Sequence, residues 1–134
     1  MRCPIALTAA VCLLATHARA QNVPAIKEIA SIAPEHSVFD AGAATRPLVL
    51  NSEKEASEHF SKDELAKLTR EVDFSKQFVL VFAWRGSGGD RLSYTVAESF
   101  PEQVAFTLTR GRTRDLRPHL HIYALRTGVK WSVR

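Results

Sequence analysis

One stretch decides the fold, the apolar run Phe78-Val79-Leu80-Val81-Phe82-Ala83-Trp84, which the glycine-rich segment Arg85-Gly86-Ser87-Gly88-Gly89-Asp90 follows. The run is too short to cross a membrane, and it lacks the spacing of an amphipathic helix. A polar turn before it and the glycines after it predict a strand that is buried on both faces. Alternation places the larger side chains on one face, and burying each of them stabilises by about 1.5–3 kcal/mol. We therefore expect this strand at the centre of the core.

The segment before the central strand predicts helices. Two capping boxes occur here, Ser52 with Glu55 and Ser61 with Glu64. In this motif the serine side chain accepts the backbone N–H of the glutamate at a helix start, and the glutamate side chain accepts the backbone N–H of the serine. The two boxes indicate two short helices, or one kinked helix, over residues 52–69. Further upstream, residues 47–51 predict a short strand and residues 37–40 a brief extended piece, while residues 25–32 fit either a strand or a helical turn.

After Trp84 the pattern changes to alternation. Apolar residues recur at every second position in four segments, at about residues 91–96, 103–109, 119–125 and 129–133. Short polar links separate them, apart from a longer one at 111–118. The fold class that follows is α+β, an antiparallel meander sheet of about five or six strands with one or two short helices packed on one face.

The first twenty residues have the features of a signal peptide. Arg2 precedes a short apolar run, and Ala18-Arg19-Ala20 is a cleavage signal before Gln21. Both cysteines, Cys3 and Cys12, would leave with this peptide. We expect a secreted or periplasmic protein without a transmembrane segment, cleaved between Ala20 and Gln21, with a poorly defined segment at 21–36 and a single domain at 37–134.

Charge is distributed unevenly along the remaining chain. Residues 85–134 hold nine basic and four acidic residues, and eight of the nine basic residues are arginine. An arginine excess of this kind suits an anionic ligand or partner. The expected export, the small net charge and the lack of a ladder of stacking aromatics argue against nucleic-acid binding. No cofactor is predicted.

The meander places two polar loops, 85–90 and 111–119, at the same end of the sheet. This edge predicts a non-enzymatic binding site for an envelope protein partner or a small anionic ligand. Glycine N–H groups and arginines there could hold a carboxylate or phosphate, although a flexible loop with ordinary Arg–Asp pairs is the alternative. The candidate binding residues are Arg85, Ser87, Gly88, Gly89, Asp90, Arg112, Arg114, Asp115 and His119.

Two other interpretations remain open. His119 and His121 share one face of a strand and, with Asp90 or Asp115, could serve a metal-dependent or hydrolytic enzyme. The second alternative is a structural module without a discrete site. No residue is predicted to be catalytic.

The chain also resembles a known family. Asp73-Phe74-Ser75-Lys76, the apolar run and Gly86-x-Gly88-Gly89 are similar to the C-terminal domain of the PrcB-like envelope proteins, which belong to a protease complex. The resemblance covers residues 26–134, and the run 111–119 resembles a subgroup of exported bacterial proteins. Where that family places an aromatic residue after the glycine pair, this chain has Asp90. The resemblance implies an accessory or interaction role and supplies no catalytic residues.

Overall fold

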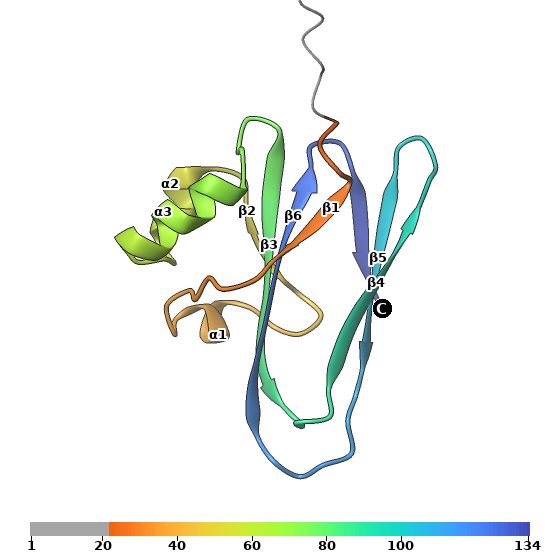
Figure 1. The fold of residues 1–134 in the computed structure, drawn as a ribbon. Helices are drawn as coiled ribbons and strands as arrows, with labels where there is room; N and C mark the ends of the chain where they lie inside the picture. The colour runs from red at the N-terminus through yellow and green to blue at the C-terminus, as the bar shows by residue number, and fades with distance from the viewer. Residues whose placement is uncertain (1–21) are drawn as a thin grey trace, which may run out of the picture.

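The computed structural model describes residues 22–134, which form three layers (Figure 1). Two helices lie on one side of a four-stranded sheet, and a three-stranded sheet lies on its other side. The expected signal peptide and its cleavage site lie outside the described residues. The α+β class is confirmed, but the arrangement of the strands differs from a single meander.

The first sheet is built around β3 (Gln77–Gly86). β3 pairs with β6 (Arg117–Arg126) over its whole length and with β2 (Leu48–Leu50) on its other side. β1 (Ile26–Ile29) pairs with the far side of β6, so part of the segment at 21–36 is an edge strand of this sheet. All of these pairings are antiparallel, and the order is β1-β6-β3-β2. The central position predicted for residues 78–84 is confirmed.

The helices begin where the capping boxes predict. Glu55 N–H donates to Ser52 Oγ at the start of α2 (Glu53–Ser57), and Glu64 N–H donates to Ser61 Oγ at the start of α3 (Lys62–Glu71). Their apolar side chains pack on the smaller residues of β3, which include Val79 and Val81. A third helix, α1 (Val38–Ala41), occupies the position of the expected extended piece at 37–40, so that prediction is wrong. Val38 is fully buried, which anchors this single turn.

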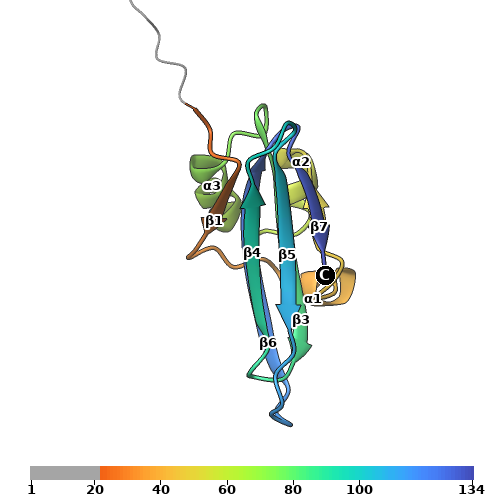
Figure 2. The ribbon, with the colours of Figure 1, turned by 90° about the vertical axis from the view of Figure 1, so that its right-hand side faces the viewer.

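The single meander is also wrong, because the chain changes sheets after β3. β4 (Arg91–Ala97), β5 (Gln103–Thr109) and β7 (Lys130–Val133) form a second sheet, in the order β4-β5-β7 (Figure 2). β4 and β5 form an antiparallel hairpin, and β7 runs parallel to β5. The larger residues of β3 explain this arrangement. Phe82 is fully buried and packs on Phe106 of β5 with ring centroids 4.8 Å apart, so the second sheet covers the face that the helices leave open.

The connections gather at two ends of the molecule. The turns after α3, between β4 and β5 and between β6 and β7 lie at one end, and the loops after β3 and before β6 lie at the other (Figure 1). β3 separates the two ends with ten residues, or about 30 Å of extended strand. None of the helices within residues 22–134 is long and apolar enough to cross a membrane.

Candidate functional site

The two loops that the sequence places at one edge do lie side by side. We call these segments, 85–90 and 110–119, the rim. Ser87 Oγ lies 2.6 Å from Thr113 Oγ1 and accepts the N–H of Thr113 at 3.1 Å. Gly88 N–H donates to Asp115 Oδ1 at 3.0 Å, and His119 Nε2 donates to the carbonyl oxygen of Ser87 at 2.7 Å. Although the loops belong to different sheet connections, these hydrogen bonds join them into one unit.

Asp90 lies inside the rim rather than on its surface. Its side chain is 1 % exposed, Oδ2 accepts the indole N–H of Trp84 at 3.0 Å, and Oδ1 accepts the N–H of Gly111 at 2.8 Å. Arg110 lies 3.2 Å from the same carboxylate. The bonds from Gly111 and Trp84, together with the charge of Arg110, hold the pKa of Asp90 below its usual 3.8. Asp90 therefore stays ionised and joins the end of β3 to the second loop.

Asp115 has a similar structural role on the outer side of the rim. Besides the Gly88 amide, it pairs with Arg117 Nε at 2.5 Å. Hydrogen bonds from Thr113, Gly88 and Arg117 hold the pKa of Asp115 far below its usual value. Both candidate carboxylates thus take part in the Arg–Asp pairs of the alternative interpretation.

The glycines of the rim allow close approach, and their N–H groups are occupied. A Cβ on Gly111 would lie 2.4 Å from the carbonyl carbon of Gly89, and one on Gly86 would lie 2.3 Å from Asp90 Oδ2. Gly89 N–H donates to Ser87 Oγ at 3.2 Å, just as those of Gly88 and Gly111 donate to carboxylates. An anion would have to displace these internal acceptors, so the glycine loop does not offer a ready cradle for a small anion.

Three arginines of the rim have no such internal partner. Within residues 22–134, no carboxylate forms an ion pair with Arg85, Arg112 or Arg114, and all three residues are exposed. Arg85 leaves β3 on the face opposite to Trp84, and its guanidinium lies 5.7 Å from the ring centroid of Phe39 in α1. Arg112 and Arg114 project from the second loop, where Leu116 is exposed as well. The rim is thus a cationic surface on a hydrogen-bonded frame.

Behind the rim, aromatic rings form a row along β3 and β6. The ring of His119 stacks on Trp84 at 4.8 Å between centroids, and His121 stacks on Trp84 at 5.7 Å and on Tyr123 at 6.3 Å. Burial lowers the pKa of His121, and the nearby carboxylate of Glu28 in β1 partly offsets this decrease. Burial also raises the pKa of Tyr123 to about 12. The row supports the rim from inside.

The residues of the enzymatic alternative do not assemble into a metal-binding group. No set of three or more His, Cys, Asp and Glu side chains that could hold a metal occurs in the described part of the chain. His119 bonds Ser87, His121 faces Glu28 at 3.9 Å, and the carboxylates of Asp90 and Asp115 bond other partners. These side chains lie near one another, but each already interacts with another residue of the protein.

Several residues that bond the candidates were not predicted as binding residues. They are Trp84, Arg110, Gly111, Thr113 and Arg117, of which Gly111, Thr113 and Arg117 lie in the loop 111–119 that the sequence placed at this edge. One signal was available for the most buried contact. A tryptophan in a core strand needs an acceptor for its indole N–H, and Asp90 follows six residues later.

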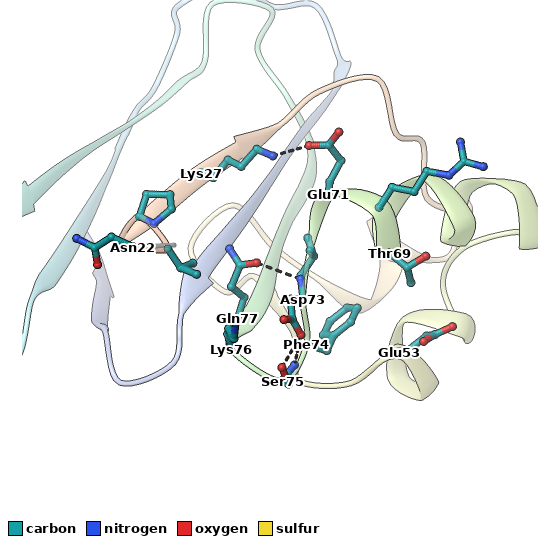
Figure 3. A pocket seen from close by; sticks show the side chains of 14 residues that line it. Asn22, Lys27, Glu53, Thr69, Glu71, Asp73, Phe74, Ser75, Lys76 and Gln77 are labelled. Atoms are coloured by element: carbon teal, nitrogen blue, oxygen red, sulfur yellow. Dashed lines mark hydrogen bonds and ion pairs between the residues drawn. The ribbon is translucent and has the colours of Figure 1, made fainter. Parts of the chain in front are cut away.

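A cavity of about 620 Å³ lies at the opposite end of the molecule, between residues 22–27 and the end of α3 (Figure 3). Several of its polar groups bond one another. Lys27 pairs with Glu71 at 2.5 Å, and Gln77 Oε1 accepts the N–H of Asp73 at 3.1 Å. Asp73 itself accepts from the hydroxyl of Ser75. Glu53, Arg70 and Lys76 also line the cavity and form no ion pair within residues 22–134, so its unpaired charges are of both signs, whereas those of the rim are all arginine.

No protein-family model matches the chain, and neither a curated protein nor a solved structure does.

Proposed function

We propose that this protein is an exported, non-enzymatic binding module that docks through its rim onto an acidic surface of an envelope protein. One observation carries the proposal: among residues 22–134, no carboxylate pairs with Arg112 or Arg114, although the loop that bears them is held by hydrogen bonds to Ser87, Gly88 and Asp90. Holding cations on an ordered frame reduces the entropy lost when a partner binds.

The occupied glycine N–H groups favour a protein surface over a small anion. A small carboxylate or phosphate would depend on backbone donors, but those of Gly88, Gly89 and Gly111 already donate within the rim. Arginine guanidinium groups remain, and they suit carboxylates spread over a surface. The exposed Leu116 beside them adds apolar area of the kind found in protein interfaces. The resemblance to an accessory domain of envelope proteins supports the same role.

A titration with a fluorescent polyglutamate peptide tests the charge recognition directly. Arg112→Ala/Arg114→Ala should weaken binding by roughly two- to thirty-fold, because each exposed ion pair contributes about 0.2–1 kcal/mol. Added salt should reduce the wild-type affinity and shrink the difference between the two proteins.

A matched control comes from α3. Lys62→Ala/Arg70→Ala removes two exposed cations from the helical layer and should leave binding at the wild-type level. Equal losses in the two double variants would mean that net charge alone, rather than the rim, attracts the peptide. Cross-linking in envelope extract would then show whether the protein captured through Arg112 and Arg114 bears an acidic surface.

A further inference from the structure

β4 is an open edge of the second sheet. Both other strands of this sheet, β5 and β7, lie on the same side of it (Figure 2). All seven of its residues are at least partly exposed, and the apolar Tyr94 and Val96 remain 38 % and 39 % exposed. An open edge offers a row of backbone N–H and C=O groups to another strand.

The usual protection of such an edge is missing. β4 pairs with β5 in unbroken register from Arg91 to Ala97, so no bulge twists the edge away. The strand contains neither proline nor lysine, the residues with which proteins commonly block edge pairing, and its one charged residue, Arg91, stands at its first position. The edge is therefore able to accept a strand.

The pairing of β5 shows which backbone groups of β4 are open. Leu108 N–H donates to Arg134, and Arg134 N–H donates to Phe106, so the even-numbered residues of β5 bond toward β7. Its odd-numbered residues bond toward β4, where Thr95 lies opposite Ala105 and Ser93 opposite Thr107. The backbone groups of Leu92, Tyr94 and Val96 consequently point outward. Tyr94 is the midpoint of the seven-residue strand.

We propose that β4 pairs with β4 of a second copy of this chain, antiparallel and with the two-fold axis at Tyr94. When all seven residues of β4 in one copy pair with β4 of the other, Tyr94 lies opposite Tyr94 and Leu92 lies opposite Val96. Every outward N–H and C=O group of one copy then faces an outward group of the other. A register centred on Ser93 or Thr95 would shorten the overlap.

The charges within the strand are compatible with this pairing. Arg91 is the only charged residue of β4. In the register centred on Tyr94, Arg91 of each copy lies opposite Ala97 of the other, so the paired strands bring no like charges together. The pairing extends the second sheet to six strands and points the two rims in opposite directions. A dimer of this protein would thus contact two acidic surfaces at once.

Sedimentation velocity over a range of protein concentrations tests the dimer. A pairing of one strand is smaller than a standard interface of about 1,600 Å², so the dimer should be concentration-dependent. Tyr94→Pro removes an outward N–H but no bond to β5, and it should leave a folded monomer. A wild-type monomer at every concentration would overturn the proposal, as would a dimer that persists in folded Tyr94→Pro.

Cysteine cross-linking gives an answer even where the proline variant does not fold. With Cys3 and Cys12 replaced by Ser, Tyr94→Cys should form a disulfide-linked dimer on oxidation, since paired Cα atoms about 5.5 Å apart fall in the disulfide range. Phe100→Cys, at the fully exposed tip of the β4–β5 hairpin, should not. Equal cross-linking at the two positions would contradict the register. Arg112→Ala/Arg114→Ala should dimerise normally, which separates this proposal from the function of the rim.

Discussion

The carboxylate of Asp90 lies 3.0 Å from the indole nitrogen of Trp84, and the two residues are only 6 % and 5 % exposed. Trp84 ends the apolar run of the central strand, and Asp90 bonds the next loop through Gly111. The contact between these two residues therefore connects the core of the protein to the frame that carries Arg112 and Arg114.

Asp90→Asn should lower thermal stability and speed amide hydrogen exchange at Gly111 and its neighbours. An amide at this position replaces one of the two acceptor oxygens by a donor that would face Gly111 or Arg110. Glu35→Gln, at an exposed carboxylate, is the control. An unchanged melting temperature together with unchanged exchange would show that Asp90 does not hold the loops.

The pH dependence of the same variant follows from the lowered pKa. The contribution of ionised Asp90 is complete well above its usual pKa of 3.8 and is lost as pH falls through the folded value. Asp90→Asn should therefore lose less stability than the wild type between about pH 5 and about pH 3. Urea denaturation across this range measures the difference in slope.

Gly111→Ala should destabilise the protein by about 1–3 kcal/mol, the usual cost of overpacking. The added Cβ would lie 2.4 Å from the backbone of Gly89 and 2.5 Å from Ser87 Oγ, so the loops must move apart. Gly42→Ala is the control, because its Cβ would meet its nearest neighbour at 3.4 Å. Chemical denaturation compares the two. A tolerated Gly111→Ala would mean that the close approach of the loops is not needed for folding.

His121 should make the protein less stable below neutral pH. Burial lowers its pKa, so the unfolded chain binds a proton more readily than the folded one as pH falls through about 6.5. Unfolding free energy should accordingly decrease from about pH 8 to about pH 5, and His121→Gln should flatten that decrease. His36→Gln, at an exposed histidine, should keep the wild-type slope. Equal slopes in wild type and His121→Gln would contradict the burial effect.

The sequence predicts the local features of this fold better than its pairing. Two capping boxes located α2 and α3, and the alternation of large and small residues in β3 assigned its two faces correctly. Alternation does not reveal which strand lies beside which. β3 pairs with β6, which begins about thirty residues later, because the glycine loop carries β4 into the other sheet.

At the candidate site, too, the sequence predicts the position of the loops but not the contacts within them. The sequence predicted that the segments 85–90 and 111–119 meet, but from a single meander that the structure does not have. They meet because β3 and β6 are antiparallel neighbours, so the loop after β3 and the loop before β6 lie at the same end. The sequence did not indicate that Asp90 is buried or that the glycine N–H groups already have acceptors. The bonds from Gly88 to Asp115 and from Gly111 to Asp90 join residues more than twenty positions apart, which no local pattern records. Only the contact of Asp90 with Trp84 and that of Gly89 with Ser87 are local.

The central claim is that the rim binds as one preformed unit, and a disulfide between its loops tests this most directly. Ser87→Cys/Thr113→Cys, in protein whose Cys3 and Cys12 are replaced by Ser, places two thiols where hydroxyl oxygens now lie 2.6 Å apart. Titration of the oxidised protein with polyglutamate should give the wild-type affinity, and Arg112→Glu/Arg114→Glu in the same background should abolish binding. Failure of the disulfide to form, or loss of binding when it does, would contradict a preformed rim.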